Sequence, residues 1–123
     1  MAPSAEFKAF VEDLFAPFGP VSVRAMFGGA GIFADGVMFG LIGDERIYLK
    51  TDEKGRKAFE DEGAEPFTFR LKTGEIVAMS YMELPERLYD EPGELTEWAR
   101  RAYDVALKSP TVAKKRRKRA KHE

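Results

Sequence analysis

Glycines and one Asp-Gly pair divide residues 21–50 into four short apolar segments, and this division constrains the fold more than any other feature. The segments are 21–27, 30–34, 37–42 and 46–50. Asp35-Gly36 separates two of them, and this dipeptide is the strongest local signal for a β-hairpin because a tight hairpin turn needs positive φ at both central residues. Segment 37–42 is apolar except at Gly40, which is typical of a central strand. We therefore expect an antiparallel sheet.

Helical patterns lie before and after these segments. From Phe7 to Phe18, apolar side chains recur at helical spacing, with Ser4 as the expected N-cap and Pro17 near the expected end. Further helices are expected over 52–62 and from Pro92 to the Ser-Pro pair at 109–110. Residues 67–71 and 75–81 alternate around a Thr-Gly turn and form a second expected hairpin.

The order of elements is therefore helix, three or four strands, helix, two strands, helix. Tight hairpins throughout make the sheet antiparallel, and amphipathic helices need one common apolar face to cover. We expect an α+β fold in two layers, with about five to six strands and the helices on one face of the sheet. The domain should span residues 1–110.

Net charge is unevenly distributed along the chain. The chain has 20 Lys and Arg residues and 21 Asp and Glu residues. Residues 114–123 hold seven of the basic residues and one acidic residue, so residues 1–113 carry a formal charge of about −7. Residues 111–123 have no apolar periodicity, and we expect a disordered basic tail. No apolar run is long enough to cross a membrane, and the first residues do not resemble a signal peptide. The chain has no cysteine, which excludes disulfides and thiol chemistry and fits a cytoplasmic location.

The basic tail is the clearest candidate for contact with a polyanion. A dense run of cations neutralises phosphates and releases counterions, which gives sequence-independent, salt-sensitive binding to nucleic acid. The alternative is a solubilising tail, or one that folds back on the acidic body. The candidate residues are Lys114, Lys115, Arg116, Arg117, Lys118, Arg119 and Lys121.

A second candidate site surrounds the first expected strand. Arg24 lies among apolar residues and is followed by a glycine cluster, so its guanidinium could bind a phosphate or carboxylate of a ligand or partner. An internal ion pair with Asp35, Asp44 or Glu83 is the favoured alternative. The cluster lacks the spacing of a phosphate-binding loop, which favours a bulge or bend in the sheet. The candidate ligand or partner residues are Arg24, Phe27, Gly28, Gly29 and Gly31.

Other residue patterns do not indicate chemistry. Aromatic residues at strand spacing could stack bases, but the body is acidic, the strands lack interleaved basic residues in the sequence, and we expect most of these rings to be core. The rings are those of Phe27, Phe33, Phe39, Tyr48, Phe67, Phe69 and Tyr81. The single histidine, His122, lies near the end of the chain and has no evident partner for metal binding or catalysis. We expect no catalytic residues, no metal and no cofactor, and therefore a protein that is not an enzyme.

Several stretches together resemble the N-terminal domain of the TfoX/Sxy family. They include DLFAPFGPVSVRAMFGG from Asp13, GIFADGVMFGLI from Gly31 and MSYMELPE from Met79, with YLKTD, EPFTF and LTEWARRA between and after them. The similarity runs from about Phe7 to Ala106. This resemblance implies an α+β domain similar in outline to type III secretion chaperones.

The resemblance also implies a class of function. Family regulators are associated with natural competence in bacteria, act as co-activators beside a cyclic-AMP receptor type protein, and have no known enzymatic role. They carry a second helical domain, whereas this sequence reads as a single-domain member with a basic tail. We expect a regulatory or adaptor protein with a protein partner, and with a homodimer through a strand edge or the glycine-bent sheet face as one route to assembly. A small-ligand or enzymatic site near Arg24, or a homodimeric chaperone-like module, is the alternative.

Overall fold

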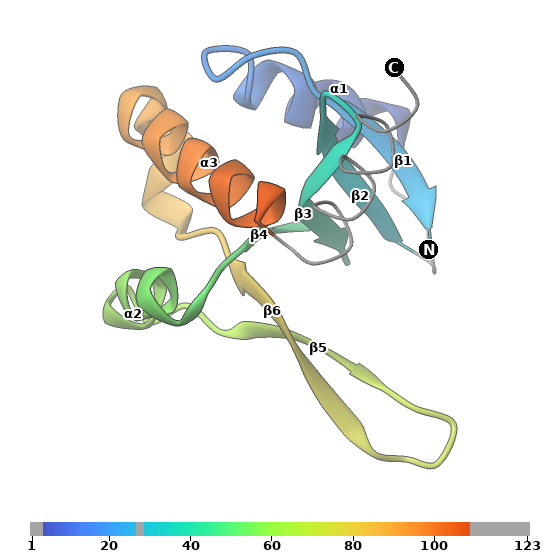
Figure 1. Cartoon of the computed structure of the whole chain (residues 1–123). Helices are drawn as coiled ribbons and strands as arrows, with labels where there is room; N and C mark the ends of the chain where they lie inside the picture. The colour runs from blue at the N-terminus through green and yellow to red at the C-terminus, as the bar shows by residue number, and fades with distance from the viewer. Residues whose placement is uncertain (1–3, 27–28, 109–123) are drawn as a thin grey trace, which may run out of the picture.

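A computed structural model describes residues 4–26 and 29–108 (Figure 1). Helices lie at both ends of the described chain and after the fourth strand. In order, the elements are α1 (Ala5–Leu14), β1 (Ser22–Met26), β2 (Gly29–Ala34), β3 (Val37–Gly43), β4 (Arg46–Lys50), α2 (Glu53–Asp61), β5 (Pro66–Arg70), β6 (Ile76–Glu83), the 3-10 helix η1 (Glu86–Asp90) and α3 (Pro92–Leu107).

The six strands form one sheet in the order β1-β2-β3-β4-β6-β5, and every neighbouring pair is antiparallel. The expected α+β fold is therefore confirmed. The Asp-Gly turn is also as expected: Ala34 pairs with Val37, and Asp35 and Gly36 both have positive φ, 50° and 76°. The expected second hairpin is present, but β6 extends to Glu83 instead of ending at residue 81, because its last residues pair with β4.

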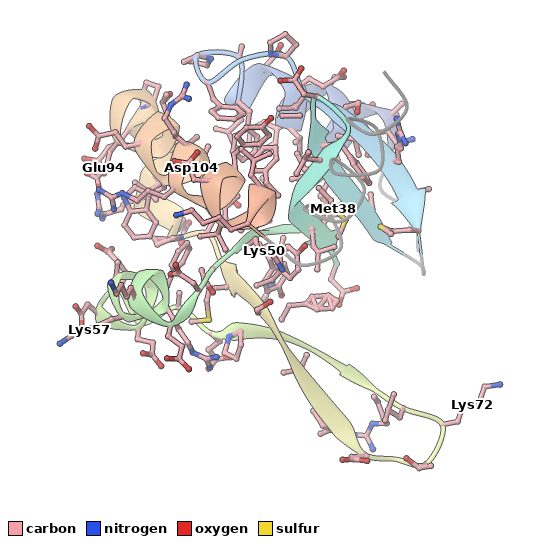
Figure 2. The ribbon with its side chains drawn as sticks, in the orientation of Figure 1. Met38, Lys50, Lys57, Lys72, Glu94 and Asp104 are labelled. Carbon is pink, nitrogen blue, oxygen red and sulfur yellow. The ribbon has the colours of Figure 1, made fainter. Side chains whose placement is uncertain are left out.

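The β5–β6 hairpin projects away from the rest of the fold (Figure 1). Only three residues of β6, from Tyr81 to Glu83, pair with β4, so the remainder of this hairpin has strand pairing on one side only. Lys72 lies at its far end (Figure 2). Ile76 is 60% exposed there.

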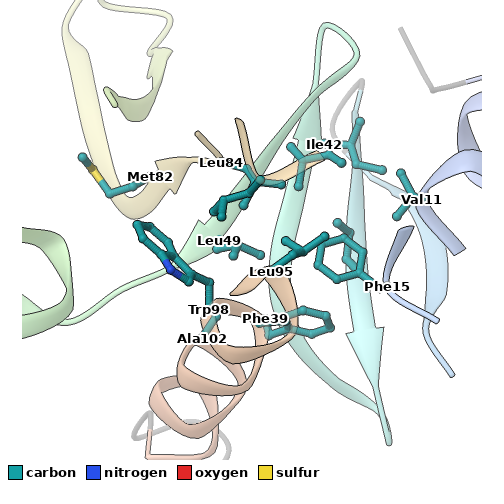
Figure 3. Packing of buried hydrophobic residues seen from close by; sticks show 14 of the residues in the cluster. Val11, Phe15, Phe39, Ile42, Leu49, Met82, Leu84, Leu95, Trp98 and Ala102 are labelled. Carbon is teal, nitrogen blue, oxygen red and sulfur yellow. The ribbon is translucent and has the colours of Figure 1, made fainter. Parts of the chain in front are cut away.

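The core lies between the helices and one face of the sheet (Figure 3). Phe39 on β3 shows how both long helices reach the same face: its ring centroid is 5.7 Å from that of Phe15, which follows α1, and 6.4 Å from that of Tyr103 on α3. Leu95 and Trp98 extend the α3 contact along the sheet. The described helices therefore cover one face of the sheet, and none of them lies on the other.

Local capping explains where the first two helices begin. Ser4 caps α1, as expected, by accepting a hydrogen bond from the backbone N–H of Phe7 at 3.1 Å. The Asp52 side chain caps α2 by accepting from the N–H of Gly55 at 2.7 Å. Such caps satisfy donors that have no partner within the helix. The 3-10 helix η1 was not expected from the sequence.

Candidate functional site

Arg24 lies on edge strand β1, opposite Gly31 of β2. Its side chain is exposed, and the guanidinium carbon lies 4.9 Å from the centroid of the Phe33 ring. No carboxylate of the described residues forms an ion pair with it; Glu83 instead pairs with Arg46 at 3.7 Å. The favoured expectation of an ion pair for Arg24 is therefore wrong, because the neighbouring ring takes the place of the carboxylate.

The described glycines of the cluster have a packing role. A Cβ on Gly29 would overlap the carbonyl oxygen of Ile42 on β3, and a Cβ on Gly31 would come within 2.7 Å of Met38 Sδ. The register between β2 and β3 shifts after Ile32, which supports the expected bulge in this part of the sheet. The candidate residues Phe27 and Gly28 lie outside the described residues, as do Lys114–Lys121 and His122.

The sheet face opposite the helices carries an unexpected group of side chains. Strand alternation and register place Arg24, Gly31, Leu41, Tyr48 and Glu83 on it, since these residues are cross-strand partners from β1 to β6. We call this surface the open face. It comprises Arg24, Met26, Gly31, Phe33, Met38, Leu41, Arg46, Tyr48, Lys50, Phe67, Tyr81 and Glu83.

The rings on the open face are the ones that the sequence placed in the core. Of the expected core aromatics that the structure describes, Phe39 belongs to the cluster beneath the helices, whereas Phe33, Tyr48 and Phe67 are half-buried on the open face. Tyr48 and Phe67 meet edge to face with centroids 5.1 Å apart. Tyr81 is buried on this side of the sheet. The expectation of a core position is therefore wrong for Phe33, Tyr48 and Phe67, whereas Phe39 and Tyr81 are buried.

Lysine and tyrosine are paired at the β4–β6 junction. Lys50 Nζ lies 4.9 Å from the centroid of the Tyr81 ring and donates a hydrogen bond to Ser80 Oγ at 3.3 Å. Burial lowers the pKa of Lys50 and raises the pKa of Tyr81 to about 12. Burial, with Glu83 as the next contributor, raises the pKa of Tyr48. Cations and rings thus alternate on the open face, which strand spacing alone did not reveal.

Arg87 on η1 forms the densest charge cluster in the described chain. Its guanidinium contacts Glu62 after α2 at 2.8 Å, Glu91 at 2.5 Å and Glu94 on α3 at 2.6 Å. These hydrogen bonds lower the pKa of Glu62 and of Glu94 and raise the pKa of Arg87. Three carboxylates that share one guanidinium, two of them with a lowered pKa, suit a structural clasp between elements, not proton transfer.

Two depressions lie between α2 and α3. One, of about 540 Å³, is lined by the Arg87 cluster, and the other, of about 370 Å³, lies beside Trp98 and Ala102. Neither is lined by Arg24 or by the glycine cluster. Within residues 4–26 and 29–108, no group of three or more His, Cys, Asp or Glu side chains is placed to hold a metal ion. No helix in that same part of the chain has the length and apolar character needed to cross a membrane.

Comparison with known proteins matches one family over most of the described fold. The family model described as the TfoX N-terminal domain matches residues 13–106, which is more than half of the chain. That range begins in α1 and ends one residue before the last residue of α3. It contains every strand of the sheet.

Three relatives match with significant similarity. The chain is 34% identical over 77 residues to the DNA transformation protein TfoX1 of Aliivibrio fischeri, covering 63% of this chain and 36% of that protein. It is 23% identical over 101 residues to Protein Sxy of Escherichia coli, covering 82% and 48%. An uncharacterised 12.7 kDa protein of Spirochaeta aurantia is 38% identical over 61 residues, covering 50% and 53%. The matches thus span about half or less of the length of these relatives.

Proposed function

The chain belongs to the TfoX N-terminal domain family, and on that premise we propose that it is a cytoplasmic regulatory protein that acts by binding, not by catalysis. In this proposal the folded body contacts a protein partner, and the cationic residues from Lys114 to Lys121 add non-specific affinity for nucleic acid. A role as co-regulator of transcription or competence is supported by the similarity to the DNA transformation protein TfoX1.

The separation of charge along the chain is the observation that carries the nucleic-acid part of this proposal. Seven cations stand within residues 114–121, whereas residues 1–113 have a formal charge of about −7. Charges farther apart than about 10 Å are screened from each other at ordinary ionic strength. The cationic segment therefore attracts a polyanion even though residues 1–113 carry a net negative charge.

The test is duplex DNA binding by fluorescence anisotropy across a salt titration. The full chain is compared with a full-length variant in which the seven cations of residues 114–121 are replaced by glutamine. If all seven contact phosphates, the plot of log affinity against log salt has a slope of about −6, and the variant loses most of this dependence.

A matched control variant removes the same number of positive charges from the folded body. Glutamine replacements at seven other cations should leave the salt dependence close to that of the unmodified chain; these are Lys54, Arg56, Lys57, Arg70, Lys72, Arg100 and Arg101. Equal binding by the unmodified chain and the residue 114–121 variant at low salt would overturn the proposed role of this segment. Absence of duplex binding by both proteins would direct the search to protein partners alone.

A further inference from the structure

No helix within residues 4–26 and 29–108 packs on the open face. All three helices contribute their buried residues to the opposite face, through positions such as Val11, Phe59 and Leu95. The open face combines half-buried aromatic rings with cations at strand spacing, on a sheet surface that no described helix covers. A sheet face of this kind is a surface on which flat, apolar groups can lie.

The cations of the open face are little neutralised by neighbouring carboxylates. Arg24 and Lys50 each lie over an aromatic ring, Phe33 and Tyr81, and neither forms an ion pair with a carboxylate of the described residues. A ring orients a cation without neutralising it. Arg46 is the third cation, and its pair with Glu83 is long, 3.7 Å, and largely exposed.

We propose that the open face binds single-stranded nucleic acid, with its half-buried rings stacking on bases and with Arg24 and Lys50 contacting phosphates. Proteins that bind single strands combine aromatic stacking with a cationic surface along the backbone. Arg24 on β1 is in register with Tyr48 on β4, three strand spacings or about 14 Å away across the sheet, and Lys50 lies two residues farther along β4. Phe33 lies on β2, beside the Arg24 side chain.

Charge argues against a second copy of this chain as the occupant. A two-fold interface places the same patch of each copy against its partner. Face-to-face pairing would therefore bring Arg24 and Lys50 of both copies together, and neither cation is ion-paired with a described carboxylate. The acidic residues near the face lie around Tyr48 and are Glu83, Asp44 and Glu65. A polyanion instead complements Arg24 and Lys50, the two cations of the face that no described carboxylate pairs.

Stacking argues for a single strand over a duplex. The bases of a duplex are already stacked on one another, whereas unpaired bases can be splayed onto protein rings. The acidic residues that give the body its negative charge include the cluster of Glu62, Glu91 and Glu94, which lies with the helices and away from the open face.

This inference goes beyond the proposed function because its site lies on the folded body and not in residues 114–121. The test therefore uses the full-length variant in which the cations of residues 114–121 are replaced by glutamine. Its binding to a fluorescent oligothymidylate of about 15 nucleotides is measured by anisotropy at low salt, beside a duplex of the same length. Any nucleic-acid binding that this variant retains comes from the folded body, so failure of the open-face proposal is distinguished from failure of the proposal for residues 114–121.

Substitutions on the face should weaken single-strand binding in a defined way. Tyr48→Leu and Phe33→Leu keep apolar volume but remove a flat ring, and each should weaken binding about fivefold or more. Arg24→Gln and Lys50→Gln should weaken binding and also reduce its salt dependence by about one ion each. Thermal melting monitored by circular dichroism verifies that each variant is folded.

Arg100→Gln is the matched control. Arg100 lies over Phe18 at 5.6 Å, the same kind of cation–ring pair, but on the helical side of the molecule. It should leave single-strand affinity unchanged. Equal losses from Arg24→Gln and Arg100→Gln, equal affinity for single strand and duplex, or no single-strand binding at all would each overturn the proposal. Dimerisation that Tyr48→Leu abolishes would do so as well.

Discussion

The ring of Phe59 meets that of Trp98 edge to face, with centroids 4.7 Å apart and an angle of 75° between the planes. Phe59 is the buried residue of α2, and Trp98 lies on the buried side of α3. The contact therefore attaches a short helix, which has little apolar surface of its own, to the helix that covers the sheet.

Phe59→Ala should lower the free energy of unfolding by about 3–5 kcal/mol, because it removes a buried ring and leaves a cavity. Trp98 is the only tryptophan, so its fluorescence should shift to longer wavelength as water reaches it. Urea unfolding followed by this emission gives both results. Phe10→Ala, at a position that is 45% exposed, is the control and should cost less than about 1 kcal/mol. Similar losses from the two variants would contradict the anchoring role of Phe59.

Gly29→Ala should destabilise the sheet by about 1–3 kcal/mol, since the added methyl group overlaps a backbone carbonyl of β3 that cannot rotate away. Gly93→Ala, in the first turn of α3, meets nothing within 4 Å and should stabilise by up to about 1 kcal/mol. Chemical denaturation of the two variants checks the contrast. A harmless Gly29→Ala would mean that β2 and β3 lie farther apart than the structure places them.

The sequence predicted the fold where local signals and burial agree. The Asp35-Gly36 turn, the Ser4 cap and the helical spacing from Phe7 each specify a structure through neighbouring residues, and each was confirmed. The end of β6 was missed because its last residues are held in the sheet by pairing with β4, which no local sequence pattern shows. The η1 helix was missed since a short 3-10 turn has no periodicity to detect.

The site was harder to predict because strand alternation does not say which face a helix covers. Phe33 and Phe39 were assigned to the core together, yet the bulge after Ile32 and the helical layer put only Phe39 beneath the helices. The partner of Arg24 was missed for a similar reason: Phe33 becomes its neighbour only when β1 pairs with β2. The Arg87 cluster depends on three elements meeting, which no local pattern encodes.

Arg87→Met should weaken the dependence of stability on acid pH. Hydrogen bonds from Arg87 lower the pKa of Glu62 and Glu94 in the folded state below their ordinary value of 4.5. A lowered folded-state pKa stabilises the fold above the unfolded value, and that stabilisation is lost as pH falls below 4.5 through the folded-state pKa. Urea midpoints between neutral pH and pH 3 should therefore fall more steeply for the unmodified chain.

Arg56→Met is the matched control for that measurement. Arg56 forms an i,i+4 pair with Glu60 at 3.5 Å on the exposed side of α2, and such pairs contribute little to stability. Its acid dependence should follow that of the unmodified chain. If Arg87→Met also follows it, the cluster does not hold α2, η1 and α3 together.

Tyr81→Phe should remove part of the alkaline instability of the fold. Burial raises the pKa of Tyr81 to about 12, from an ordinary value of 10.0. A raised folded-state pKa leaves stability intact below pH 10 and lowers it as pH rises toward 12, at up to about 1.4 kcal/mol per pH unit, because the unfolded chain loses this proton first. Urea unfolding at pH 9, 10 and 11 should show a shallower decline for Tyr81→Phe than for the unmodified chain. Parallel declines would mean that the Tyr81 hydroxyl is in contact with solvent on the open face.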